Sequence, residues 1–384
     1  MRVISKSVFL FLTALLVVVV SFGRDNVSHK IVPVSVLVKT DTISKVFGFD
    51  GQKRYAYCPS VVQEGEKRHI WFCGTEPEGQ FIDHIYYIRG DAVNPASTIK
   101  MVLAPGPDGA WDSQHVCDPS VIKGDFKFND KKYKYAMFYL GNRKNRFYNE
   151  IGVAFANSPD ADKWLKYPRQ LVEKTWDGEN DVTLVNSGGV VRKAWGVGQP
   201  SVISIDKKGK VLLTYTIGDN SGSRVVLREA NLSDMSSFVL DKVVTVSISG
   251  LKQVNKTSQD ILVNADFALD KGKQNIYMVR HVLPNPSGYP AFISSAIEMD
   301  SMSFKDFHSG GGTWQPLVRI DSIKSGFPRN HNACISRNSF GFINIPTAPE
   351  LYFTVSKEFP QVSPTPNTNA EWTYQIYKYT KPDK

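Results

Sequence analysis

Five short segments of this chain each place a polar or sulfur-bearing side chain at the start of an apolar run. These side chains are spaced by 60, 81, 67 and 66 residues: Cys58, Asp118, Gln199, Asp266 and Asn332. The start of a buried strand is normally apolar, because an unpaired carboxylate is costly there. Two carboxylates at such positions therefore favour a site for acid–base chemistry, although one Asp alone is more simply explained by a hydrogen bond between neighbouring strands.

Further side chains that can bind or react lie just before these segments, or in the turns after the second strand of each unit. The first set is Trp111, His115, Trp195, Asn264, Arg329 and His331, and the second set is Asp83, Glu150 and Arg224. Each type also has a structural explanation, since indoles pack between blades, carboxylates occupy turns and imidazoles cap loops. Together they have the composition of a carbohydrate-binding cleft, and we expect Cys58, Gln199 and Asn332 to join them in contacting a ligand.

Short strands must position these residues. Runs of β-branched and aromatic residues, bounded by Gly, Asn, Asp and Pro, are typical of strands. Second strands are expected at residues 69–74, 135–141, 211–216, 275–279 and 351–355, and third strands at 85–88, 151–155, 224–227, 292–296 and 374–377. Fourth stretches marked by Trp or Pro follow in most units, as at 164–168 and 314–317.

Five units of four strands predict an all-β fold, a five-bladed β-propeller with four-stranded blades. A β-sandwich or two separate β domains are the alternatives, but a sandwich has no reason to repeat its first strand five times. In a propeller, the starts of the first strands, the turns after the second strands and the connections between blades share one face. The candidate residues are therefore expected around the central channel on that face.

The first residues have the pattern of a signal peptide, residues 1–23. Arg2 and Lys6 precede an apolar run at 8–22, and Gly23 follows it at a small-residue cleavage position. That run is short for a membrane span, which needs about 20 residues, so export with cleavage is favoured over an uncleaved anchor. Residues 24–384 are expected to form one propeller domain, closed by pairing of residues 31–38 with the strand at 374–377.

The charge pattern limits the range of partners. The formal net charge is +9, but the Lys and Arg residues are scattered through turns and no nucleic-acid-binding motif is present. The hydrophobic content of 42% and the length of 384 residues suffice for a core without a metal. We expect an exported monomer with no cofactor and a carbohydrate ligand, and leave a structural Ca²⁺ in the channel open.

Four cysteines in an exported chain can form disulfides. Cys58 and Cys73 are expected at neighbouring ends of an antiparallel strand pair, which allows a bridge. Cys58 and Cys117 are expected at equivalent ends of adjacent blades, which allows a competing bridge. Free buried cysteines are the third possibility.

The chain resembles the five-bladed propeller glycoside hydrolases, nearest to glycoside hydrolase family 43 and its relatives. The resemblance rests on residues 117–122, on residues 150–159 with Trp164 behind them, and on residues 198–202. As a blade pattern it covers most of the chain after residue 50, while the strictly matching words are short.

Enzymes of this kind use a carboxylate base, a second Asp and a carboxylic acid donor, each on a different blade. The resemblance implies Asp118 as the base and Asp266 as the second Asp. The acid has no motif match, so Glu150 and His331 are both candidates, His331 because a related propeller family uses His in this role. Cys58 stands where the family has an Asp, and this departure favours the alternative of a non-catalytic glycan-binding propeller.

Overall fold

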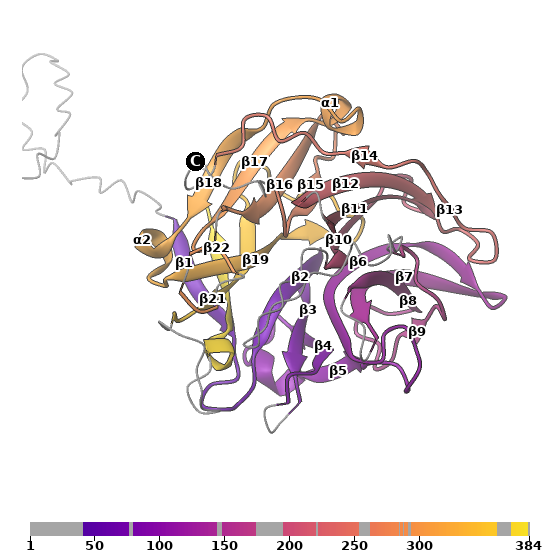
Figure 1. Ribbon diagram of the computed structural model, residues 1–384, viewed down its shortest axis with the longest axis horizontal. Helices are drawn as coiled ribbons and strands as arrows, with labels where there is room; N and C mark the ends of the chain where they lie inside the picture. The colour runs from indigo at the N-terminus through magenta and orange to yellow at the C-terminus, as the bar shows by residue number, and fades with distance from the viewer. Residues whose placement is uncertain are drawn as a thin grey trace, which may run out of the picture. The chain divides into compact units, whose positions relative to one another are not determined.

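Five sheets, antiparallel within each blade, are arranged in a ring in the computed structural model (Figure 1). The described residues are 41–76, 80–143, 148–173, 195–219, 222–252, 262–283, 285–286, 288–290, 293–358 and 370–382, all within the unit Lys39–Lys384. The predicted signal peptide and the predicted strand at 31–38 lie outside these residues. Among the described residues, no helix has the length and apolar character needed to cross a bilayer.

The first two blades contain β2 to β5 and β6 to β9. Blade 1 consists of β2 (Ala56–Glu64), β3 (Lys67–Thr75), β4 (Asp83–Arg89) and β5 (Lys100–Leu103), with the 3-10 helix η1 (Pro95–Thr98) before β5. Blade 2 consists of β6 (His115–Phe128), β7 (Lys131–Asn142), β8 (Glu150–Ala156) and β9 (Leu165–Lys166). In both blades the innermost strand comes first in the sequence, as the repeat predicts.

The third and fourth blades continue the same order. Blade 3 consists of β10 (Gly196–Ser204), β11 (Lys210–Asp219), β12 (Gly222–Asn231), β13 (Val239–Leu240) and β14 (Val244–Thr245). Blade 4 consists of β15 (Asp266–Leu269), β16 (Asn275–His281), β17 (Ile297–Ser303) and β18 (Gln315–Ile320), with α1 (Phe304–His308) between the last two. Because β13 and β14 both pair with β12, the sheet of blade 3 has five strands.

The last blade joins the two ends of the described chain. It consists of β19 (Arg329–Ile335), β21 (Glu350–Ser356), β22 (Gln375–Thr380) and β1 (Thr42–Phe47), with α2 (Ser322–Ser325) before β19 and η3 (Ala370–Thr373) before β22. Strand β1 pairs with β22, and the short β20 (Arg337–Asn338) pairs in parallel with β2 of blade 1. The chain ends therefore close the ring as predicted, but the strand that does so is Thr42–Phe47.

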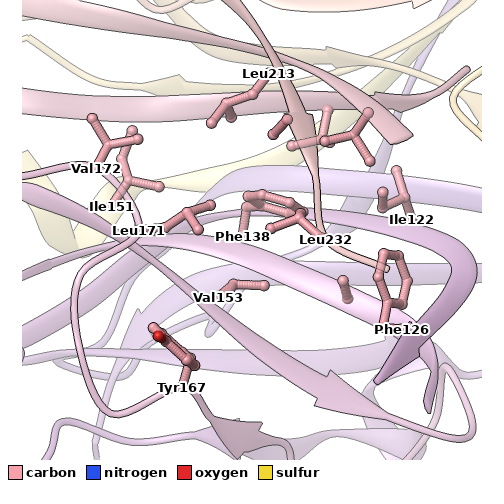
Figure 2. Close-up of a cluster of buried hydrophobic side chains, with 14 of the residues drawn as sticks. Ile122, Phe126, Phe138, Ile151, Val153, Tyr167, Leu171, Val172, Leu213 and Leu232 are labelled. Carbon is pink, nitrogen blue, oxygen red and sulfur yellow. The ribbon is translucent and has the colours of Figure 1, made fainter. Parts of the chain in front are cut away.

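Each pair of neighbouring blades encloses its own hydrophobic core. The core between blades 2 and 3 is drawn in Figure 2 and includes Phe126, Phe138, Val153 and Leu213. Four further clusters fill the spaces between blades 1 and 2, 3 and 4, 4 and 5, and 5 and 1. Both faces of the blades are thus buried, which explains why the strands read as apolar runs.

One strand prediction was wrong. The third strand of blade 4 was expected at 292–296, but β17 begins at Ile297. Its sequence alternates apolar residues with Glu298 and Asp300, which look unsuited to a buried strand. Arg280 on the neighbouring β16 pairs with both carboxylates, at 2.7 Å and 3.3 Å, and Arg319 lies 3.9 Å from Glu298, so each carboxylate has a cationic partner in the blade.

Candidate active site

A repeated β-bulge positions five side chains at the channel. In blades 1, 2, 3 and 5, two residues of the innermost strand stand opposite one residue of the next strand. The first bulge residue has left-handed backbone angles in each case, and Asn264 has the same angles just before β15. We call the five residues the bulge ring: Cys58 (φ 50°), Asp118 (φ 47°), Gln199 (φ 53°), Asn264 (φ 47°) and Asn332 (φ 45°).

The bulge ring corrects the predicted alignment of the fourth segment by two residues. Its member in blade 4 is Asn264, and Asp266 corresponds to Ser60, Ser120 and Ser201 of the other blades. Asp266 accepts hydrogen bonds from Ser201 Oγ at 2.6 Å and from the Ile335 amide at 2.9 Å. It also pairs with the buried Arg337 at 3.2 Å.

Arg337 serves as a hub below the bulge ring. Its guanidinium group donates to Ser120 Oγ at 2.9 Å, to Ser201 Oγ at 3.2 Å and to the carbonyl of Phe267. Asp266 balances the charge of this guanidinium group. Through its bonds to Ser201 and Ile335, Asp266 also links blade 4 to blades 3 and 5. These contacts assign Asp266 a structural role at the channel, as the single-Asp explanation expects.

Polar contacts connect the bulge ring across all five blades. Asn332 Nδ2 donates to Cys58 Sγ, and Cys58 Sγ lies within 4.8 Å of an Asp118 carboxylate oxygen. The Cys58 thiol and the Gln199 backbone amide both lower the pKa of that carboxylate, and the Asn264 amide donates to Gln199 Oε1 at 3.3 Å. A central carboxylate is thus fixed by neighbours on both sides.

His281 completes the circle between blades 4 and 5. The Asn332 amide donates to its Nε2 at 2.7 Å, and the Asn264 side-chain amide lies 3.1 Å from its Nδ1. Burial and the neighbouring His331 lower the pKa of His281 to about 3, so the ring is neutral and accepts at Nε2. His281 was not predicted from the sequence, because it lies at the end of a second strand.

A wide cleft opens above the bulge ring, with an empty volume of about 1870 Å³ that includes its open mouth. Its lining includes the predicted residues Asp83, His115, Asp118, Trp195, Gln199, Asn264 and Asn332. Cys58 lines the narrow channel just below, together with Asp118 and Gln199. These residues come from innermost strands, second-to-third turns and blade connections, which confirms that the three kinds of segment share a face.

Aromatic side chains form one wall of the cleft. Tyr55, Tyr57, Phe81 and Tyr374 line it, and Trp372 stacks on Phe81 with ring centroids 4.7 Å apart. Trp195 lines it too, and donates from Nε1 to Ser223 Oγ at 3.2 Å. Aromatic rings beside polar groups suit the apolar faces and hydroxyl groups of sugars.

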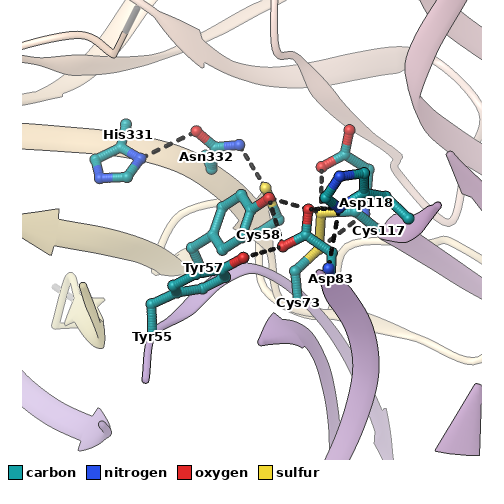
Figure 3. Close-up of a disulfide and its surroundings, with 10 residues drawn as sticks. Tyr55, Tyr57, Cys58, Cys73, Asp83, Cys117, Asp118, His331 and Asn332 are labelled. Carbon is teal, nitrogen blue, oxygen red and sulfur yellow. Dashed lines mark hydrogen bonds and ion pairs between the residues drawn. A yellow bond between two sulfur atoms is a disulfide. The ribbon is translucent and has the colours of Figure 1, made fainter. Parts of the chain in front are cut away.

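Two carboxylates lie close together at the floor of the cleft. Asp83 accepts from Tyr55 Oη at 2.7 Å and from Tyr57 Oη at 3.2 Å, and its Oδ2 lies 3.1 Å from His115 Nδ1 (Figure 3). Burial, together with the nearby charge of Asp83, raises the pKa of Asp118 to about 6. Asp118 is therefore mostly ionised at pH 7 and close to its titration midpoint, which suits a general base.

The disulfide differs from both predicted pairings. Cys73 is bonded to Cys117, and Cys58 is a buried free thiol beside them (Figure 3). The bond joins the second strand of blade 1 to the first strand of blade 2. The second free cysteine among the described residues, Cys334, lies in the core between blades 5 and 1. Spacing along the chain cannot distinguish these pairings, because three of the four sulfur atoms lie within 4.8 Å of one another.

Several predicted residues lie away from the cleft. Trp111 is buried on Tyr139 and lies so close to Gly152 that a β-carbon there would meet its ring at 2.4 Å, so it packs into the core between blades 1 and 2. Glu150 is buried and accepts from Gln170 Nε2 at 2.9 Å. Arg224 pairs with Asp219 at 2.7 Å.

The other two predicted residues support the cleft from behind. Arg329 is buried and donates to the carbonyl of Ile293 at 2.8 Å. His331 is buried, and its Nδ1 lies 3.0 Å from Asn332 Oδ1. Burial lowers the pKa of His331 to about 3, so it donates this hydrogen as a neutral ring and orients the Asn332 amide toward Cys58.

A third carboxylate of the cleft, Glu371, was not predicted from the sequence. It lies in η3, just before the third strand of blade 5, and accepts a hydrogen bond from Tyr289 Oη. Burial raises its pKa, and its Oε2 is buried without a hydrogen-bond partner among the described residues. Glu371 has no equivalent in the repeated segments of the other blades, so the repeat pattern could not indicate its place in the cleft.

The fold is that of the five-bladed propeller glycoside hydrolases, as comparison with solved structures shows. The family 117 glycoside hydrolase Zg3597 of Zobellia galactanivorans matches with a TM-score of 0.53 and 14% identity over 89% of this chain and 90% of that one. The α-L-arabinofuranosidase PaAbf62A of Podospora anserina matches with a TM-score of 0.53 and 10% identity, covering 90% and 97%.

A further match is the GH43_1 enzyme of Xanthomonas citri, with a TM-score of 0.51 and 12% identity over 89% of this chain and 90% of that one. No protein-family model and no curated protein sequence matches this chain. At these sequence identities the structural similarity establishes the fold alone. The chemistry has to be inferred from the residues of the site.

Proposed function

We propose that the protein is a glycoside hydrolase that binds an oligo- or polysaccharide in the cleft. The observation that carries the proposal is the placement of Asp118, a carboxylate with a pKa of about 6, at the floor of an aromatic-lined cleft. Two of the solved structures of this fold are described as complexes with cellotriose and with xylotriose, which supports a sugar ligand. Export is part of the proposal and rests on the apolar run at residues 8–22.

The acid and the base are assigned from their surroundings. Asp118 takes a proton from the attacking water, because it is mostly ionised at neutral pH, and Cys58 and Gln199 favour its charged form. Glu371 donates a proton to the leaving oxygen, because burial favours its protonated form. Asp83, held by Tyr55 and Tyr57, adds negative charge beside the positive charge that develops on the sugar.

The second candidate is a glycan-binding propeller without catalysis. Four of the five bulge-ring positions are uncharged, whereas the enzymes of this fold use carboxylates from several blades. In that case Trp195, Tyr55 and the amides of the bulge ring would serve recognition alone. The two candidates differ in one observable, because only the first releases sugar.

Glu371→Gln tests the assignment of the acid. A proton donor matters most for poor leaving groups, so the variant should lose about 10²–10⁴-fold in turnover on natural oligosaccharides. On aryl glycosides with strongly acidic phenols the loss should fall below about tenfold. Equal losses on both substrates would show that Glu371 does not protonate the leaving group. Glu350→Gln is the matched control, because Glu350 pairs with Arg68 and Lys378 away from the cleft.

A further inference from the structure

Four side chains that can ligate a metal converge at the bulge ring, which supplies two of them (Figure 3). The Sγ atoms of Cys58, Cys73 and Cys117 and a carboxylate oxygen of Asp118 all lie within 4.8 Å of one another. They come from β2, β3 and β6, so the frames of two blades fix their positions. Cys117 and Asp118 line the cleft, which provides a route from solvent.

Two N–H groups already point at these sulfur atoms. The backbone amide of Asp118 donates to Cys73 Sγ at 2.9 Å. Asn332 Nδ2 donates to Cys58 Sγ, and His331 orients that amide through Asn332 Oδ1. Hydrogen bonds of this kind are the outer-shell contacts that orient thiolate ligands and stabilise their charge in metal sites.

We propose that these four side chains bind a soft divalent cation of the Zn²⁺ class when the disulfide between Cys73 and Cys117 is reduced. Three thiolates and one carboxylate form a four-ligand set, and Zn²⁺ prefers four sulfur, nitrogen or oxygen ligands in a tetrahedron. In the oxidised protein the disulfide occupies two of the three sulfur ligands. The site therefore exists in the reduced protein alone.

The redox step requires an external reductant, a dithiol or a phosphine. It delivers two electrons to the sulfur–sulfur bond, which breaks and takes up two protons to give two thiols. The cation then displaces the protons of the three thiols into solvent and binds the resulting thiolates. Because Asp118 becomes a ligand, a bound cation also takes away the base assigned above.

Titration with Cd²⁺ tests the site directly, since thiolate-to-Cd²⁺ charge transfer gives an ultraviolet absorption band. Protein reduced with a phosphine should show this band at one Cd²⁺ per chain, and oxidised protein should not. Cys58→Ala and Asp118→Asn should each weaken Cd²⁺ binding by at least about tenfold. Cys334→Ala is the matched control and should leave it unchanged, because Cys334 is a buried free cysteine outside the cluster.

Three results would contradict the proposed cation site. A band of equal strength in oxidised and reduced protein, or one that Cys58→Ala does not weaken, contradicts it. If reduction alone unfolds the propeller, Cd²⁺ added before the phosphine must keep it folded, and unfolding in its presence also contradicts the proposal. The titration needs no substrate, so the metal site can be refuted while the glycosidase assignment stands. Likewise, an absence of hydrolysis would not refute the metal site.

Discussion

The Sγ atom of Cys58 lies within 4.8 Å of a carboxylate oxygen of Asp118, and both residues occupy the same bulge position in neighbouring blades. The resemblance to family 43 glycoside hydrolases implies a carboxylate at the position of Cys58. A second carboxylate would repel the charge of Asp118, whereas the thiol stabilises it. Cys58 therefore adjusts the acidity of the proposed base, and the loss of one carboxylate does not by itself imply the loss of catalysis.

Cys58→Ala should move the acidic limb of the pH–rate profile to higher pH. The Cys58 thiol lowers the pKa of Asp118, which burial holds at about 6, so its removal raises that pKa further. A polar contact that contributes about 1 kcal/mol to the charged form corresponds to a shift of about 0.7 pH units. An unchanged acidic limb in Cys58→Ala would show that Cys58 does not influence the pKa of Asp118. Cys334→Ala is the control.

Asp118→Asn should stabilise the protein at pH 7. The pKa of Asp118 is about 6 in the folded protein against 3.8 ordinarily, so between these values the folded state binds more protons than the unfolded state. The free energy of unfolding of the wild type therefore falls as pH rises through this window.

The Asn variant does not titrate and should be more stable at pH 7 by about 1–3 kcal/mol, an advantage that disappears near pH 3. Urea unfolding at both pH values measures this difference. Asp162→Asn is the control, because the side chain of Asp162 is 88% exposed. A gain that persists at pH 3 would contradict the explanation.

Asp266→Asn should destabilise the fold. The substitution leaves Arg337 buried without its counter-charge, which costs on the order of 3–5 kcal/mol. The double variant Asp266→Asn with Arg337→Met should recover part of this loss, because it removes both charges. Thermal unfolding of the three variants checks this. A fully stable but inactive Asp266→Asn protein would return Asp266 to the chemistry.

His281→Ala should also destabilise the fold, by about 2–4 kcal/mol. It leaves a cavity between blades 4 and 5 and removes the acceptor for the buried Asn332 amide. His308→Ala is the control with an expected change within about 0.5 kcal/mol, since the side chain of His308 is 48% exposed. Equal effects of the two substitutions in a denaturant titration would refute the role of His281.

The fold was predictable because the bulge repeats in sequence as well as in space. In three blades a Pro follows the bulge residue, as Pro59 follows Cys58, and an apolar strand follows each. Blade 4 lacks this Pro, so Asp266 was aligned with the bulge residues although Asn264 holds the equivalent position. The misalignment placed Asp266 in the bulge ring, whereas it contacts Arg337, Ser201 and Ile335 below it.

Two other features of the site depend on distances in space that a sequence repeat does not reveal, namely the position of Glu371 and the pairing of the cysteines. Glu371 reaches the cleft from a segment without a counterpart in the other blades. Which cysteines pair depends on how two blades meet, and Cys73 meets Cys117 because β3 ends beside the start of β6. Trp111 was placed on the correct face, but its side chain fills space over Gly152.

The most direct test of the account is turnover by the wild type and by Asp118→Asn on the best substrate from a panel of plant and microbial oligosaccharides. The account predicts hydrolysis by the wild type and a loss of at least about 10²–10⁴-fold in kcat for the variant, with glycan affinity retained. Asp118→Asn keeps the size of the side chain and removes the charge that a base requires. Tight glycan binding by a wild type that hydrolyses no member of the panel, with Asp118→Asn unchanged in both respects, would contradict it and leave a glycan-binding propeller.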